Sequence, residues 1–165
     1  MRVVEGRADI GDVGAFVADL DAVGDDHGVT IQAFDARYVV DRAHLERAVD
    51  LASRAREREE TIADDFGVEI LLYAAGRRQI NRALEMGVGE GECPVVAVVV
   101  GENEGDEERA ADDLRERFTP AETLGEYDDE LVRAFFDVGD TELAATEGTL
   151  ADAVRERVAL LVVDK

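Results

Sequence analysis

Residues 69–82 read Glu-Ile-Leu-Leu-Tyr-Ala-Ala-Gly-Arg-Arg-Gln-Ile-Asn-Arg, an apolar run followed by a basic and polar one. The apolar run 69–74 predicts a buried strand, because a short continuous apolar stretch bounded by a turn residue is typical of a strand inside a core. Gly76 is expected to turn the chain into a helix that extends to about Met86. Arg77 and Arg78 then stand in the first turn of that helix.

Two arginines at a helix start are unusual. Cations there oppose the helix dipole, at a cost of about 0.3–1 kcal/mol each, so stability alone favours acids. Free N–H groups together with two guanidinium groups make an anion site suited to a phosphate. Tyr73 and Ile80 add an aromatic and an aliphatic surface on which a nucleobase can rest. The pattern therefore favours a functional anion site suited to a phosphate, beside a surface on which a base can rest.

The preceding helix carries Arg47, Arg54 and Arg58 close together beside its apolar face. Asp50 precedes Arg54 by four residues, so ion pairing within the helix explains part of this stripe. For Arg47 and Arg54 we favour that structural explanation.

The charge of the chain is extreme and uneven. The 165 residues hold 40 acidic and 18 basic ones, a net charge of −22, and the acids are spread along most of the sequence. Such a surface is typical of adaptation to molar salt, where the screening length is only about 3 Å, so we infer a halophilic, archaeal source. Residues 37–82 differ, with nine arginines and nine acids. This segment is a relative positive patch.

The pattern along the chain predicts one domain, residues 1–165, of mixed α/β (α+β) class, with a mostly antiparallel sheet packed by helices. The size is that of a single domain, and no linker divides it. Its strand order does not follow from the sequence. We expect strands at 2–8, 29–34, 69–74 and 95–100, a turn at 25–28, and helices at 12–23, from 41 to the low sixties (ending at Phe66-Gly67), 76–86, 106–117, 128–137 and 149–162.

The sequence offers no recognisable catalytic set. Ser53, the only serine, lies inside the arginine-rich helix, so a hydrolase elbow is absent. His27 and His44 have no second ligand at metal-binding spacing, which favours solvated or capping roles. Residues 87–91 and 101–105 lack the lysine and hydroxyl of a phosphate loop. Cys93 is the only cysteine, and we expect it to be buried and unreactive. We predict a binding protein that is not an enzyme and uses no cofactor or metal.

Residues 69–80, together with the helix that contains Arg42-Ala43-His44-Leu45, resemble the KEOPS-complex accessory subunit related to the PRPK-binding protein of eukaryotes. The resemblance implies helices packed on an antiparallel sheet, binding to the small kinase-like ATPase of KEOPS, and recruitment of tRNA by its single-stranded 3′ CCA end for threonylcarbamoyladenosine modification. It assigns Arg78, Gln79 and Ile80, and also Arg77, to the tRNA end. Arg58 is a further candidate RNA contact, but Glu59-Glu60-Thr61-Ile62 stands where relatives have a basic, Asn-containing segment, which weakens the case for it.

The kinase contact has a candidate in the last helix, where Leu150, Val154 and Val158 form an apolar stripe, although such a stripe is more often core. No apolar run is long enough to cross a bilayer, and the N-terminus lacks a signal peptide. We therefore expect a cytoplasmic protein without membrane or DNA contacts. Two alternatives stay open: a protein-only regulator of the kinase that does not bind RNA, and an unrelated small halophilic enzyme.

Overall fold

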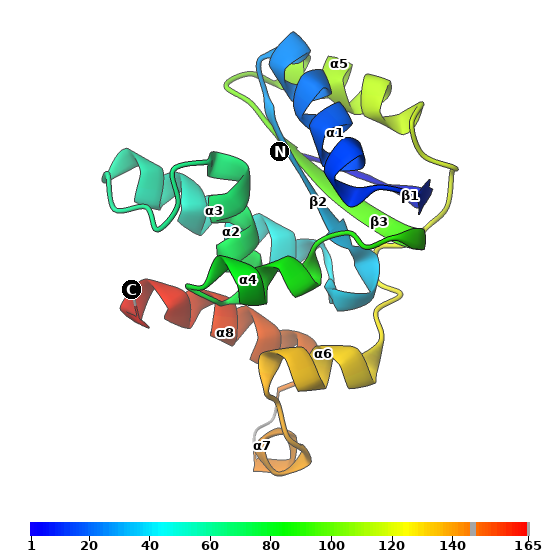
Figure 1. The fold of residues 1–165 in the computed structure, drawn as a ribbon. Coiled ribbons are helices and arrows are strands. Elements are labelled where there is room, and N and C mark those ends of the chain that lie inside the picture. Colours follow the sequence, from blue (N-terminus) through cyan, green and yellow to red (C-terminus); the bar gives the residue numbers. More distant parts are fainter. Residues whose placement is uncertain (146–147, 165) are drawn as a thin grey trace.

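The structure is a computed structural model that describes residues 1–145 and 148–164. It confirms a single domain of mixed α/β class with an antiparallel sheet (Figure 1). The elements, in chain order, are β1 (Arg2–Ile10), α1 (Val13–His27), β2 (Thr30–Asp35), the 3₁₀ helix η1 (Ala36–Tyr38), α2 (Arg42–Glu57), α3 (Phe66–Ala75), α4 (Ile80–Ala83), the 3₁₀ helix η2 (Leu84–Met86), β3 (Gly91–Val100), α5 (Glu104–Arg115), α6 (Asp129–Phe136), α7 (Asp140–Ala145) and α8 (Leu150–Asp164).

The strand β3 is the centre of the sheet, in the order β1-β3-β2, and pairs antiparallel with both neighbours. Residues 95–99 are fully buried because both faces of the strand are covered. Since alternate side chains of a strand point to opposite faces, Val96 and Val98 enter one core and Val95, Ala97 and Val99 enter the other. Helices α1 and α5 cover one face, and α2, α3 and α8 build the layer on the other.

One predicted strand is wrong. Residues 69–74 belong to helix α3, which is buried on all sides from Glu69 to Ala75. A buried helix shows no polar stripe, so its sequence has the same appearance as a buried strand. The start signal lies upstream, where the Asp65 carboxylate accepts a hydrogen bond from the Val68 amide at 2.9 Å. Phe66 and Gly67 therefore open α3, whereas α2 ends earlier, at Glu57.

Other boundaries also move. Residues 25–27 of the turn predicted at 25–28 form the last turn of α1, and Gly28 caps that helix. The helix predicted for 76–86 is shorter, with α4 beginning at Ile80 and η2 following it. The helices predicted at 106–117, 128–137 and 149–162 correspond to α5, α6 and α8.

The end of α2 places a non-glycine residue in a left-handed conformation. Glu59 has a φ of 57°, and the amide of Glu60 donates to the carbonyl of Ala55 at 2.9 Å, which closes the helix. This position usually belongs to glycine, because a Cβ there costs about 1–2 kcal/mol.

Glu59→Gly should therefore stabilise the protein, by about 0.5–1 kcal/mol after the added flexibility of the unfolded chain is subtracted. Chemical denaturation followed by circular dichroism measures this. Glu57→Gly is the matched control, since Glu57 is within the helix and glycine there should cost about 1 kcal/mol. Equal destabilisation by both substitutions would contradict the prediction.

Candidate functional site

The junction between α3 and α4 carries the residues singled out from the sequence. Gly76 ends α3 with a φ of 62°, and the amide of Arg77 donates to the carbonyl of Leu72 at 3.0 Å. A Cβ on Gly76 would lie 3.2 Å from the carbonyl oxygen of Arg157 in α8. Left-handed geometry and close packing both require glycine here, and residues 77–79 form a short connection to α4.

The electrostatic setting of the two arginines is the reverse of the one predicted. Arg77 and Arg78 follow the C-terminus of α3, and α4 begins only at Ile80. The C-terminal end of a helix dipole is negative and favours cations by about 0.3–1 kcal/mol each. The placement of these arginines is therefore favourable to stability, and their functional role depends on what they expose.

Arg77 has a structural role. It is partly buried, its Nη2 donates to the carbonyl of Phe135, and its guanidinium carbon lies 5.3 Å from the centre of the Phe135 ring. Arg157 donates to the next two carbonyls, those of Phe136 at 3.1 Å and Asp137 at 3.0 Å. These groups are the unsatisfied C-terminal carbonyls of α6, so two arginines cap that helix.

The exposed part of the junction consists of the residues after Arg77. Ile80 is 47% exposed and Leu84, one helical turn further on, is 57% exposed, so two aliphatic side chains lie near each other on the surface. Leu84 was not among the predicted residues, although its spacing from Ile80 is a usable signal. We name this surface the α4 surface; it comprises Arg78, Gln79, Ile80, Asn81, Arg82 and Leu84, all exposed.

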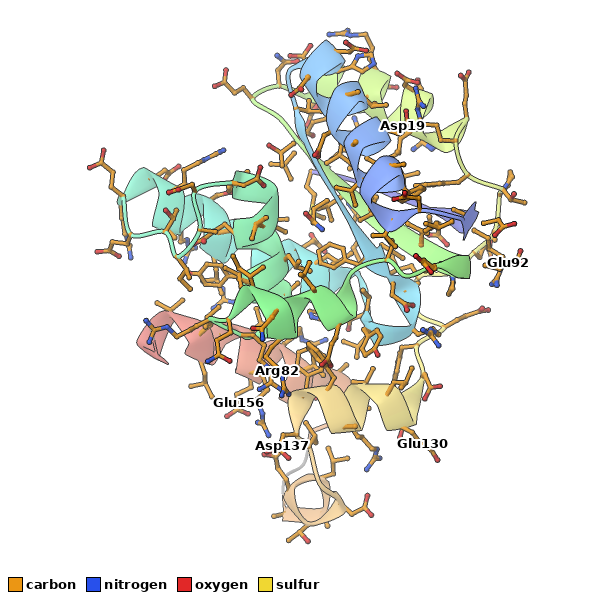
Figure 2. All side chains as sticks on the ribbon, viewed as in Figure 1. Asp19, Arg82, Glu92, Glu130, Asp137 and Glu156 are labelled. Carbon is orange, nitrogen blue, oxygen red and sulfur yellow. The ribbon has the colours of Figure 1, made fainter. Side chains whose placement is uncertain are left out.

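Most arginines of the described residues pair with a carboxylate. In the part of the chain that the structure describes, eleven arginines form ion pairs with carboxylates, among them Arg47 and Arg54, which share Asp50 at 3.8 and 3.1 Å. This is the structural pairing expected for that stripe. Arg82 has no ion pair within residues 1–145 and 148–164. Figure 2 marks Arg82 and five exposed carboxylates: Asp19, Glu92, Glu130, Asp137 and Glu156.

Two predicted contacts lie elsewhere. Tyr73 is 1% exposed and belongs to the core between α2 and α3, so it offers no surface to a base. Arg58 is exposed but follows α2, at the opposite end of α3 from Arg78. Ten helical residues separate these ends by about 15 Å, so Arg58 does not join the α4 surface.

A buried histidine of α2, His44, binds the last turn of α3, next to the junction. The Nδ1 atom of His44 accepts from the Val40 amide at 3.4 Å, and Nε2–H donates to the carbonyl of Ala74 at 2.7 Å. Burial lowers the pKa of His44 to about 4, so the ring is neutral. It satisfies one of the last carbonyls of α3 and fastens that end to α2. This is the capping role expected for His44.

The stripe proposed as a kinase contact is part of the core. Leu150, Val154 and Val158 are buried against α2, α3 and α6, because the inner face of α8 closes this layer. They are not available to a partner in this structure. Among the side chains of α8 that the structure describes, Leu160 and Val162 are exposed aliphatic residues.

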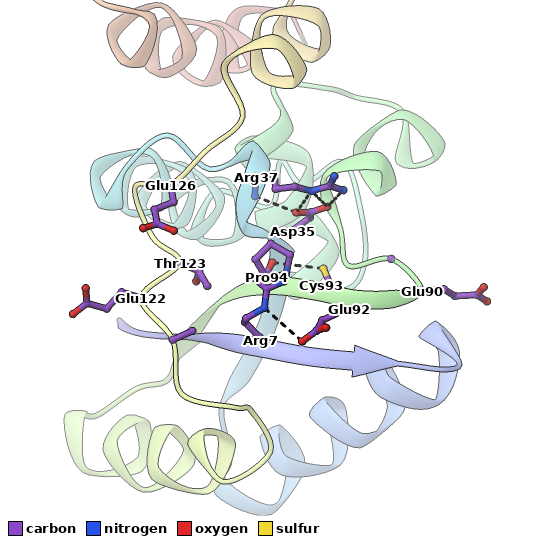
Figure 3. A pocket seen from close by; sticks show the side chains of 12 residues that line it. Arg7, Asp35, Arg37, Glu90, Glu92, Cys93, Pro94, Glu122, Thr123 and Glu126 are labelled. Carbon is purple, nitrogen blue, oxygen red and sulfur yellow. Dashed lines mark hydrogen bonds and ion pairs between the residues drawn. The ribbon is translucent and has the colours of Figure 1, made fainter.

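A cleft of about 590 Å³ lies at one end of the sheet (Figure 3). Its Arg37 is held by Asp35 through bonds of 3.1 and 2.7 Å, and burial raises the pKa of the Cys93 thiol, which makes it a poor nucleophile. Cys93 is buried as expected.

Within the described residues there is no group of three or more His, Cys, Asp and Glu side chains arranged to hold a metal. No described helix is long and apolar enough to span a membrane.

The fold and the α4 surface are those of a small α/β protein that presents a cationic and aliphatic patch on an acidic body. Residues 20–161 match the family model described as kinase binding protein CGI-121. The chain belongs to this family, which confirms the family resemblance read from residues 69–80 and its kinase-binding character. No curated protein matches the sequence.

Proposed function

We propose that the protein is a non-catalytic subunit of the KEOPS complex, which binds the kinase-like ATPase and recruits tRNA by its single-stranded 3′ CCA end. Membership of a kinase-binding family supports the first part. The observation that supports the second is the α4 surface, where the exposed Arg78, Gln79 and Arg82 flank the exposed Ile80 in the sequence.

This surface suits a short single strand better than a duplex. Binding driven by phosphate contacts alone weakens steeply with salt, and an acidic chain adds repulsion. Recognition of unstacked bases by apolar contact and hydrogen bonds depends less on salt. We further propose that the acidic surface reflects a halophilic, archaeal and cytoplasmic setting, in which that mode of recognition persists.

Arg78→Glu tests the RNA role. In molar potassium chloride, the unaltered protein should bind intact tRNA roughly tenfold more tightly than tRNA trimmed of its CCA end, by fluorescence anisotropy. Arg78→Glu should remove this preference, because a carboxylate at that position repels the phosphate that the guanidinium attracts. Circular dichroism should show an unchanged fold, since Arg78 is exposed.

Arg115→Glu is the matched control. Arg115 is an exposed arginine of α5, in the helical layer on the opposite face of the sheet, and its substitution should leave the preference intact. Equal binding of trimmed and intact tRNA by the unaltered protein would refute the tRNA-end role. If a kinase-like ATPase still copurifies in that case, the protein is a regulator of the kinase without RNA binding.

A further inference from the structure

The outer edge of β1 carries backbone groups that the described part of the chain leaves unpaired. β1 is an edge strand, since the sheet has the order β1-β3-β2. The N–H and C=O of Arg7 bond to Thr119 on the side away from β3, at 2.9 and 2.8 Å. Because alternate residues of a strand direct these groups to the same side, Val3 and Glu5 direct theirs to the outer edge as well. Within residues 1–145 and 148–164, neither backbone has a hydrogen-bond partner at that edge.

A cleft lies beside these groups. If the pairing continued beyond the Arg7–Thr119 bridge, Ala121 would stand opposite Glu5, yet no backbone hydrogen bond joins the two. Residues 120–122 instead border a mainly apolar cleft of about 510 Å³, together with the strand from Val3 to Glu5 and with Phe118. An unpaired strand edge is a template for another extended chain, and here it adjoins a cavity that can take a side chain.

The charges around the cleft favour a basic partner. Glu5 and Glu122 line it, and neither forms an ion pair within the described residues. Arg115, which also lines the cleft, is neutralised by Asp112 at 2.7 Å. The Oε1 atom of Glu5 accepts from the Thr123 amide at 2.8 Å, which leaves its other oxygen for a partner. A second copy of the chain would bring the same carboxylates and another net charge of −22, so a basic segment suits this edge better.

We propose that the outer edge of β1 binds an extended basic and apolar segment of a partner protein, which adds a strand to the sheet through Val3 and Glu5. Main-chain hydrogen bonds supply the affinity in this mode of binding, and alternate side chains supply the specificity. Residues opposite each other in an antiparallel pair share a face. The partner residue opposite Glu5 is therefore basic, and the one opposite Val4 is apolar and enters the cleft beside Phe118.

This surface is separate from the proposed RNA site. Leu84 of the α4 surface lies by β2, which is the other edge strand of the sheet. Binding at β1 can therefore be measured independently of tRNA.

The test uses the full-length protein and a fluorescein-labelled peptide of alternating arginine and valine, about eight residues long. Anisotropy in molar potassium chloride, where attraction between exposed charges is screened, should show binding in the micromolar range. N-methylation of the arginine amides should weaken binding roughly tenfold, because these N–H groups face Val3 and Glu5. N-methylation of the valine amides is the matched control and should have little effect, since those groups point away from β1.

Val3→Pro tests the same contact from the side of the protein. It removes an outward N–H and leaves the bonds between β1 and β3, since residues 2, 4 and 6 make those bonds, so the strand should persist. Binding of the unmethylated peptide should weaken roughly tenfold. Asp9→Pro is the matched control: the Asp9 N–H also points outward, but it lies beyond the Arg7–Thr119 bridge and outside the cleft, so affinity should be kept.

Four outcomes would overturn the inference. They are absence of peptide binding, equal weakening by both methylation patterns, equal losses in Val3→Pro and Asp9→Pro, and a dimer of the unaltered protein that Val3→Pro dissociates in sedimentation experiments. The last outcome would assign the edge to a second copy of the chain. The two methylated peptides decide the question even if Val3→Pro fails to fold.

Discussion

Glu69→Ala should lower the free energy of unfolding by about 3 kcal/mol, because Glu69 joins the core to the loop between α2 and α3. Its fully buried carboxylate accepts hydrogen bonds from the amides of Ile62, at 3.0 and 3.1 Å, and Ala63, at 2.8 Å. Alanine leaves two amides without an acceptor and a cavity in the first turn of α3. Denaturation with guanidinium chloride, followed by circular dichroism, measures the loss.

Two further variants separate this role from a change in net charge. Asp64→Ala removes an exposed carboxylate from the same loop and should change stability by no more than about 0.5 kcal/mol. Glu69→Gln keeps an oxygen for Ala63 and should fall between the other two. If Glu69→Ala is no less stable than Asp64→Ala, the carboxylate does not anchor the loop.

Acidification should destabilise the protein through His44. Its pKa is about 4 in the folded protein and about 6.5 in the unfolded chain, so the unfolded chain takes up a proton first as pH falls. The stabilising contribution of neutral His44 is complete above pH 6.5 and declines as pH falls toward 4. At lower pH about 3 kcal/mol is lost, since burial disfavours the charged ring, which also cannot accept from the Val40 amide.

His44→Gln isolates this contribution, because the glutamine amide can donate to the Ala74 carbonyl but does not titrate. Its unfolding free energy should depend less on pH between 6.5 and 4 than that of the unaltered protein. The carboxylates titrate alike in both proteins, so the difference curve reports His44. Parallel curves over this range would show that the buried imidazole has no linkage to folding.

The sequence predicted the sheet well, because its strands carry a clear signal. The run 95–100 is apolar throughout and forms the middle strand, and the N-terminal strand and 29–34 pair on either side. By contrast, α3 could not be distinguished from a strand, since burial on every side removes the 3.6-residue period. Because α3 was predicted as a strand, Arg77 and Arg78 were expected at the start of a helix, whereas they follow the C-terminus of α3. The sign of the helix-dipole effect on them is therefore the opposite of the predicted one.

The sequence predicted the exposed residues of the candidate site, but it did not predict how the neighbouring residues pack against the rest of the protein. Arg78, Gln79 and Ile80 are exposed, as a binding surface requires. Arg77 is structural because it donates to the carbonyl of Phe135, which is 58 residues away in the sequence. A local sequence pattern cannot indicate such a contact. The apolar stripe of Leu150, Val154 and Val158 is a similar case. The stripe itself is visible in the sequence, but the helices that cover it are distant in the chain and cannot be read from it.

The two arginines that cap α6 also connect distant segments of the chain. Arg77 lies next to Arg78 and holds Phe135, while Arg157 in α8 holds Phe136 and lies against Gly76. A displacement of α6 that keeps the bond from Arg77 moves the residue adjacent to Arg78. If a protein that docks on α6 changes the affinity of a ligand at the junction, that ligand changes the affinity of the protein by the same factor, which is reciprocal thermodynamic coupling.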